Sequence, residues 1–350
     1  MRNARPFVRA AAARVGGVDS QARRRSPIDS LAVDGALLAV VLMWASVFAI
    51  FKIAWRDIDP VAFTGVRFAI MVGLSVAVLA VAGPRRLPRR TDLPILAASG
   101  LAGYFLYQMG FVLGLNRTSA VASAILVSTH PMFSVLFSWV IGRERPSRAA
   151  IAGLVVGFAG VVAFLGGWNA LGAARVGDLL SLGAAAAFGA YGVINQGIGD
   201  DRLSGRQVMA YGLAIGGTLT VLVSLPAMVQ QDWSAVSGES WLILLYSAIG
   251  PVYLAYALWN WAIRRRGIAH TVAYAFLVPV LGGLMAVLFL NEHVGPEQVV
   301  GAVLVIAGLV ITRLGGRPRA GVRGLRTWDA RGQRSTPEQT PAPTLTAQEE

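Results

Sequence analysis

The stretch "STHPMF" at 128–133 places a histidine and a proline in the middle of a long apolar run, between "SAVASAILV" and "SVLFSWVI". An imidazole titrates near neutral pH, so His130 could hydrogen-bond a substrate, carry a coupling proton or donate to a backbone carbonyl. Pro131 has no N–H and crowds the carbonyl four residues earlier, which bends a helix and frees backbone acceptors. The pair therefore marks a point at which an apolar helix opens.

Arg67, within "FTGVRFAI", is the one basic residue well inside an apolar run. A guanidinium near the centre of a bilayer costs on the order of 3 kcal/mol on insertion scales and usually faces the interior of a helix bundle. Two interpretations follow. Arg67 could bind an anionic group of a substrate, or it could have a structural role, either snorkelling outward or pairing with Asp57 or Asp59.

Aromatic side chains with a polar tip are the third group of candidates. Those near the middle of an apolar run could line a cavity, although such rings also serve ordinary packing and interfacial belts. We expect four of them to join Arg67 and His130 in substrate binding: Trp44, Tyr104, Tyr107 and Tyr253. The chain has no cysteine and its three histidines are widely spaced, so we expect no metal site and no cofactor.

The elements that carry these residues have the composition of a membrane protein. Hydrophobic residues make up 55% of the chain and charged residues 14%, whereas a soluble domain has about 25% charged residues. Crossing the hydrocarbon takes about 20 residues. Ten apolar segments approach that length: 34–54, 61–82, 93–113, 119–141, 149–167, 178–197, 207–229, 240–262, 270–290 and 296–313. The sequence predicts an all-α membrane protein with ten transmembrane helices.

The net charge of +13 is distributed unevenly among the connections. Of the 31 basic residues, 26 flank one face of the predicted bundle, 4 flank the other, and Arg67 lies within a span. The positive-inside rule then places both termini in the cytoplasm. This pattern is a topology signal, so we expect no nucleic-acid partner. We also expect an arginine-rich tail at 1–33 and a disordered tail at 315–350.

A shift of 148 residues aligns two halves of the chain, at 34–167 and 175–314. Pro131 then matches Pro279, and Glu144 matches Glu292. Each half has five spans, and an odd number predicts inverted repeats with a substrate site between them. Both prolines should bend their helices, and the bends should face each other. The glutamates are span-end carboxylates for which we favour a structural role, capping the following helix or pairing with Arg143 or Arg145, over gating.

Four stretches together carry a family resemblance: "WASVFAIFKIAW", "FTGVRFAI", "HPMFSVLFSWVIGRERPS" and "VPVLGGLMAVLFLNEHVGPEQVVGAVLVIAGLVIT". Over 35–314 the chain resembles an EamA-type member of the drug/metabolite transporter superfamily. The resemblance implies transport of small metabolites, often amino-acid-like, without ATP. The sequence has no G-x-x-x-x-G-K-[ST] loop, so transport would be gradient-driven or passive.

We therefore expect an alternating-access exporter of small polar or amphipathic metabolites in a bacterial plasma (inner) membrane, with protons as a candidate coupling ion. The competing interpretations are a passive channel and a non-transporting membrane receptor. An enzyme is disfavoured. "GIGD" at 197–200 has the G-x-G-D form of intramembrane aspartyl proteases, but that chemistry needs two neighbouring carboxylates. No second Asp lies in the interior of a predicted span, since Asp34 and Asp178 are the first residues of theirs.

Overall fold

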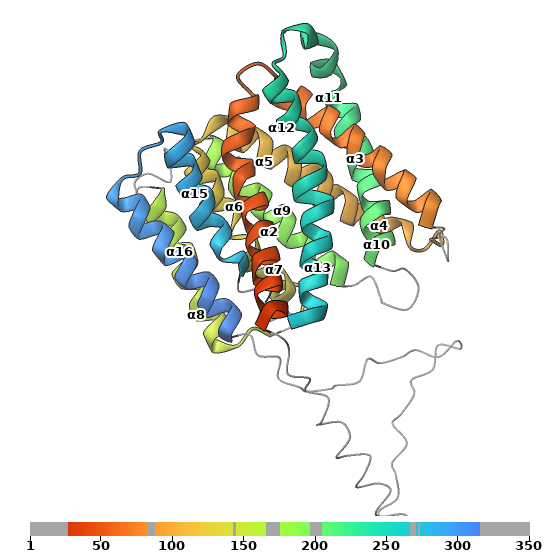
Figure 1. The fold of residues 1–350 in the computed structure, drawn as a ribbon. Helices are drawn as coiled ribbons and strands as arrows, with labels where there is room; N and C mark the ends of the chain where they lie inside the picture. Colours follow the sequence, from red (N-terminus) through yellow and green to blue (C-terminus); the bar gives the residue numbers. More distant parts are fainter. Residues whose placement is uncertain are drawn as a thin grey trace, which may run out of the picture. The chain divides into compact units, whose positions relative to one another are not determined.

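The computed structural model describes residues 27–82, 88–142, 145–165, 176–196, 205–266, 271 and 274–315. Glu144, the "GIGD" loop and most of both predicted tails lie outside these residues. Every element in the described part of the chain is a helix (Figure 1). The expectation of an all-α protein is therefore confirmed for these residues.

The helices follow the predicted apolar segments closely. They are α2 (Pro27–Ala54), α3 (Pro60–Ala82), α4 (Leu93–Gly100), η1 (Leu101–Leu106), α5 (Tyr107–Arg117), α6 (Ala120–Val127), α7 (His130–Val140), α8 (Arg148–Phe164), α9 (Val176–Gln196), α10 (Gly205–Gly212), η3 (Leu213–Gly217), α11 (Thr218–Gln230), η4 (Trp233–Ala235), α12 (Gly238–Ile249), η5 (Gly250–Leu254), α13 (Ala255–Arg266), α15 (Leu277–Leu290) and α16 (Pro296–Gly315).

Within the described residues, seven helical stretches are long and apolar enough to cross a membrane. They are α2, α3, α4 through α5, α6 with α7, α9, α10 through α11, and α12 through α13. Three shorter apolar helices, at 148–164, 277–290 and 296–312, coincide with the remaining predicted segments. Large apolar side chains such as Val229, Leu242 and Leu288 are exposed on the outer surface, as contact with lipid requires.

Short polar residues set the ends of several helices. The hydroxyl oxygens of Ser119, Ser147 and Ser237 accept hydrogen bonds from the backbone N–H three residues later, at the starts of α6, α8 and α12. Asp59 does the same for α3, accepting from the N–H groups of Val61 and Ala62. These caps fix where the chain enters the apolar core.

Two irregularities recur at the 148-residue spacing. The fourth predicted span breaks at Ser128 and Thr129, between α6 and α7, and the ninth has a turn at Phe276 before α15. The π-helical segments η1 and η5 lie at matching places in the third and eighth spans. A π-helical turn holds more residues than an α-helical one, and such turns are frequent at functional sites.

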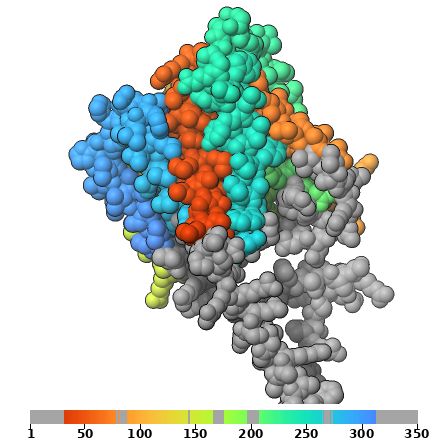
Figure 2. Space-filling model, in the orientation of Figure 1, coloured from red at the N-terminus to blue at the C-terminus, as the bar shows by residue number. Residues whose placement is uncertain are grey.

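The packing places α2 against α15 on one side and against α12 and α13 on the other, an arrangement visible on the molecular surface (Figure 2). At the periphery, α8 and α16 pack directly on each other through glycines. Gly153 lies against Gly308 and Gly160 against Gly301, so the two helices run antiparallel. A side chain at any of these positions would collide with the backbone of the partner helix.

Candidate functional site

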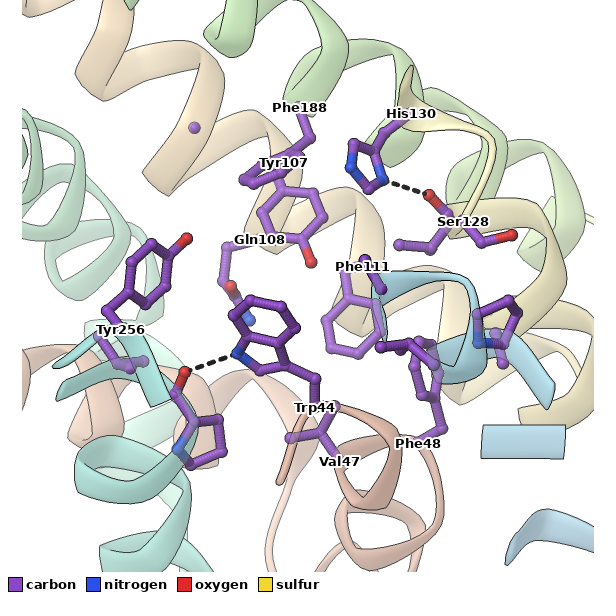
Figure 3. Close-up of a pocket in the computed structure, with 18 of the residues that line it drawn as sticks. Trp44, Val47, Phe48, Tyr107, Gln108, Phe111, Ser128, His130, Phe188 and Tyr256 are labelled. Atoms are coloured by element: carbon purple, nitrogen blue, oxygen red, sulfur yellow. Dashed lines mark hydrogen bonds between the residues drawn. The ribbon is translucent and has the colours of Figure 1, made fainter. Parts of the chain in front are cut away.

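A cavity of about 400 Å³ lies among the helices, within the size range of small-molecule sites. Residues from α2, α3, η1, α5, α9, η5 and α13 line it, together with both broken helices (Figure 3). Pro131 and Pro279 both contribute to its wall. Most of the lining is aromatic or aliphatic, including Trp44, Tyr107, Phe111, Phe188, Tyr256 and Trp259.

Arg67 lines this cavity and is almost completely buried, with 6% of its surface exposed. Its Nε donates to the carbonyl of Ser247 at 3.2 Å, and its guanidinium carbon lies 5.2 Å from the ring centroid of Phe51 and 5.7 Å from that of Phe68. The ring faces partly offset the buried charge. The Nη1 atom has no hydrogen-bond partner among the described residues.

Arg67 pairs with neither of the carboxylates considered from the sequence. Asp57 accepts from the hydroxyl of Ser240 at 2.6 Å and from the N–H of Ser237 at 2.8 Å. The Asp59 carboxylate caps α3. The guanidinium therefore carries a buried positive charge without an acidic partner in the described part of the chain.

Gln108, one residue after Tyr107 on α5, is a cavity residue that the sequence reasoning did not select. Its side chain is 5% exposed, and its Nε2 has no hydrogen-bond partner among the described residues. A long polar amide inside "FLYQMGF" was the available signal, because an apolar span gives such a group few partners. Figure 3 shows Gln108 and Tyr107 on neighbouring parts of the wall.

The predicted aromatic residues Trp44, Tyr104 and Tyr107 all line the cavity. The indole N–H of Trp44 donates to the carbonyl of Pro251 at 2.9 Å, and the hydroxyl of Tyr104 is 3.2 Å from that of Tyr191. Trp44 also lies against Trp259, with ring centroids 5.1 Å apart. The polar tips of Trp44 and Tyr104 are thus already bonded, and their rings offer apolar surface.

The polar residues of "STHP" satisfy the backbone of the broken helix. The side chains of Ser128, Thr129 and His130 each bond the carbonyl three residues earlier, at 2.6, 2.6 and 3.2 Å. The acceptor for His130 Nδ1 is Val127, which is the carbonyl that an N–H at Pro131 would otherwise reach. This is the geometry of the third interpretation, in which His130 donates to a freed carbonyl.

Comparison with known proteins identifies the family. The model of the EamA-like transporter family matches residues 32–166 and again 175–314, which together are most of the chain. The chain belongs to the EamA-like transporter family. It is accordingly a multi-pass membrane transporter with a small-molecule substrate.

Matches between this EamA-like transporter and its curated relatives extend over almost the full length of those relatives. A probable terminal-alkyne amino-acid exporter from Streptantibioticus cattleyicolor is 32% identical, over 83% of this chain and 97% of that protein. A probable amino-acid metabolite efflux pump from Salmonella typhimurium is 26% identical, over 83% and 98%. One solved crystal structure shares the fold, with a TM-score of 0.53 at 21% identity, covering 82% of this chain and 99% of that one.

Tyr253 was predicted to bind substrate, but it is not among the residues that line the cavity. Its hydroxyl donates to the carbonyl of Met71 at 2.7 Å and lies 2.8 Å from the hydroxyl of Ser75. Tyr256, three residues later, lines the cavity instead. Tyr253 belongs to the π-helical segment η5, and its depth along the span, on which the prediction rested, does not fix the direction of its side chain.

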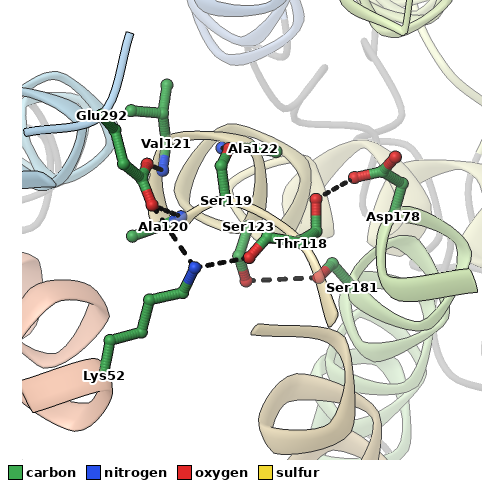
Figure 4. A network of polar contacts seen from close by, with 10 residues as sticks. All are labelled: Lys52, Thr118, Ser119, Ala120, Val121, Ala122, Ser123, Asp178, Ser181 and Glu292. Atoms are coloured by element: carbon green, nitrogen blue, oxygen red, sulfur yellow. Dashed lines mark hydrogen bonds and ion pairs between the residues drawn. The ribbon is translucent and has the colours of Figure 1, made fainter. Parts of the chain in front are cut away.

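Glu292 belongs to a separate polar network at the end of α15 (Figure 4). Its two carboxylate oxygens accept from the N–H groups of Ala120 and Val121 at 2.7 and 2.9 Å, and Oε1 lies 3.3 Å from Lys52 Nζ. Lys52 Nζ also donates to the carbonyl of Thr118 at 2.6 Å. The carboxylate thus caps α6, the first half of the broken helix, rather than the helix that follows it in sequence.

Proposed function

We propose that the chain is a secondary transporter that exports small amphipathic, amino-acid-like metabolites by alternating access across a bacterial plasma (inner) membrane. Ten crossings would form two inverted five-helix repeats, at 34–167 and 175–314. Export and the amino-acid-like class are supported by the relatives named as an amino-acid exporter and an amino-acid metabolite efflux pump. The absence of a nucleotide-binding loop from the sequence supports gradient-driven transport.

Reciprocal packing supports the inverted repeats. Gly153 matches Gly301 and Gly160 matches Gly308 at the 148-residue spacing, and the contacts pair Gly153 with Gly308 and Gly160 with Gly301. Exchanging the two repeats reproduces the same pair of contacts, as a two-fold axis requires. Because the matched helices α8 and α16 run antiparallel, the axis would lie in the membrane plane, the arrangement of inverted-topology transporters.

The path of the chain supports cytoplasmic termini. In Figure 1, α2 begins and α16 ends at the same, lower end of the bundle, whereas the connections at 55–59 and 231–237 lie at the upper end. The arginine-rich connections of the sequence are predicted to lie at the lower end, the end that the positive-inside rule assigns to the cytoplasm. Reporter fusions within 230–238 should be external and fusions within 198–206 internal. The opposite location at either loop would overturn the inverted-repeat topology.

The observation that carries the transport proposal is the cavity between the two broken helices, with Arg67 buried in its wall. A buried guanidinium with an unbonded N–H is costly unless a ligand pairs with it. We therefore assign Arg67 the binding of an anionic substrate group. His130 is assigned to the helix break, on the strength of its bond to Val127, and proton coupling stays a prediction that a variant can test.

Transport is tested first in cells and then with purified protein. Extracellular metabolites of a deletion strain and an overexpressing strain are compared, and the candidates are offered to purified protein in liposomes. We expect saturable uptake that is stimulated by unlabelled substrate on the opposite side, as alternating access requires. Flux that does not saturate and shows no such exchange would identify a passive channel. Binding without flux would identify a receptor.

A further inference from the structure

We propose that the cavity selects a monocarboxylate with an apolar, ring-sized body, held at its carboxylate by Arg67 and Gln108, and that an amino group on the ligand is not required. This inference rests on the proposed function and narrows its substrate class. It differs from recognition of a complete amino acid, in which the ammonium group would also need a partner.

Two unused donors carry the proposal. Arg67 Nη1 and Gln108 Nε2 are both buried and both without a hydrogen-bond partner among the described residues, and both side chains line the same cavity. Buried polar groups in proteins are almost always hydrogen-bonded. Four other buried atoms lack a partner in the described part of the chain, but they belong to residues that do not line the cavity: Trp55, Ser138, Ser224 and Thr312. What points to an absent acceptor is therefore the presence of two unpartnered donors on side chains of one cavity wall. Because both atoms are donors, the matching ligand group accepts, and a carboxylate accepts at two oxygens.

The two donors belong to adjoining parts of the wall. The Arg67 guanidinium lies over the Phe51 ring, and the centroid of that ring is 6.0 Å from the centroid of Phe111. Phe111 lies one helical turn after Gln108 on α5, and residues three apart share a face of a helix. The helices α3 and α5, which carry Arg67 and Gln108, are in contact.

The charges around the cavity favour an anion over a cation. The described lining residues include Arg67 and no aspartate or glutamate. A ligand ammonium would therefore meet a positive charge without a carboxylate to offset it, whereas a ligand carboxylate neutralises the buried guanidinium with charge-assisted hydrogen bonds.

The rest of the lining fits an apolar body. Trp44, Phe111, Phe188 and Trp259 present ring surfaces, and the indole N–H of Trp44 is already bonded to Pro251. Burying a ligand ring among them removes apolar area from water and allows offset or edge-on ring contacts. The site therefore distinguishes ligands by a carboxylate at one end and an apolar group at the other.

Three ligands with the same ring separate the contributions of a carboxylate and an ammonium group to binding affinity. 3-Phenylpropanoate has only the carboxylate, phenethylamine has only the ammonium, and L-phenylalanine has both. Binding is followed by the tryptophan fluorescence of the purified full chain, since Trp44 and Trp259 line the cavity. We expect 3-phenylpropanoate to bind at least as tightly as L-phenylalanine and at least tenfold more tightly than phenethylamine. Equal or tighter binding of phenethylamine would overturn the proposal, as would a tenfold advantage of L-phenylalanine over 3-phenylpropanoate.

Gln108→Met tests the amide, with Gln231→Met as its matched control. Gln231 is a fully bonded glutamine: Oε1 accepts from the N–H of Asp59 at 2.8 Å, and Nε2 donates to the carbonyls of Asp57 and Asp232 at 3.0 and 3.1 Å. We expect Gln108→Met to weaken 3-phenylpropanoate binding about five- to tenfold and Gln231→Met to leave it unchanged. Equal affinity in the wild type and Gln108→Met would overturn the role of Gln108.

Gln108→Glu provides a second variant that keeps the size of the side chain. An added carboxylate beside the guanidinium should abolish 3-phenylpropanoate binding and improve phenethylamine binding, whereas retained carboxylate selectivity would overturn the proposal. The ligand series also separates this inference from the proposed function. Carboxylate-selective binding without any transport in liposomes would contradict the transport function alone, and transport with selectivity for the amine would contradict the inference alone.

Discussion

Polar side chains are hydrogen-bonded in the network around Glu292, whereas two polar side chains in the wall of the cavity have atoms that no described residue bonds. At the end of α15, both oxygens of Glu292 and the ammonium of Lys52 are bonded, and nearby Thr118 donates to Asp178 while Ser181 donates to Ser123 at 3.2 Å. In the cavity, Arg67 Nη1 and Gln108 Nε2 have no partner in the described part of the chain.

The contrast separates polar groups that hold the fold together from those available to a ligand. A satisfied buried network stabilises the folded state, and removing one member leaves its partners unpaired. An unsatisfied buried group destabilises the folded state until a ligand completes it. The bonded set should therefore affect stability, and the unbonded set should affect binding and transport.

The largest expected effect is at Arg67. Arg67→Ala removes the only positive charge of the described cavity lining, and hydrogen bonds to charged groups contribute about 1.5–3 kcal/mol, so transport should fall between about tenfold and a hundredfold. Arg67→Lys keeps the charge and should retain part of the transport. Initial rates in liposomes, at matched protein levels, provide the measurement. Wild-type rates in the alanine variant would exclude an essential binding role.

Glu292→Ala should lower stability and leave ligand binding unchanged. It removes two hydrogen bonds that cap α6 and the partner of Lys52, so we expect the free energy of unfolding to fall by about 1–2 kcal/mol. Ligand affinity should stay within about twofold of the wild type, and a thermal melt with a binding titration measures both. Wild-type stability with much weaker ligand binding in this variant would instead show that Glu292 takes part in binding.

Variants of His130 test whether this residue has a structural role or a role in transport. His130→Leu removes the bond to Val127 and should lower the free energy of unfolding by about 1 kcal/mol, whereas His130→Gln can keep a hydrogen bond. If His130 only completes the helix break, the glutamine variant transports normally and responds normally to an imposed pH gradient. Normal binding with loss of that response would instead identify His130 as the proton-coupling residue.

The smallest effect is expected at Asp57, in the connection between α2 and α3. Hydrogen bonds from Ser240 and then Ser237 outweigh partial burial and lower the pKa of the Asp57 carboxyl below its usual value. Because the folded-state pKa is depressed, the stabilisation is present above the unfolded-state pKa of about 3.9 and is lost as pH falls through the folded-state pKa. Melting temperatures from pH 6 to pH 3 should fall more steeply for the wild type than for Asp57→Asn.

Much of the fold was predictable because membrane helices follow apolar length and composition. The predicted segments coincide with helices throughout the described residues, and the position of the break in the fourth span follows from Pro131. The π-helical segments were not predictable from an α-helical period. Tyr253 was expected in the cavity because it lies near the middle of a predicted span, and depth along a span does not show which way a side chain faces.

The candidate site was predictable only in part. Arg67 and His130 stood out as polar residues in apolar sequence, but no sequence pattern could show that His130 bonds Val127 while Arg67 Nη1 stays unbonded. Likewise, the cap that Glu292 provides for α6 joins residues more than 170 positions apart. These contacts depend on three-dimensional packing and not on local spacing.

Thermal melts of the wild type, Arg67→Ala and Glu292→Ala, each with and without 3-phenylpropanoate, test the central claim most directly. A ligand that binds only the folded state raises the melting temperature in proportion to its occupancy. Arg67→Ala removes a buried charge but also the hydrogen bond to the Ser247 carbonyl, so its own melting temperature is not the readout. We predict that Arg67→Ala gains nothing from ligand, while Glu292→Ala melts lower than the wild type and gains as much from ligand as the wild type does. An undiminished ligand-induced rise in the melting temperature of Arg67→Ala would contradict the binding role of Arg67.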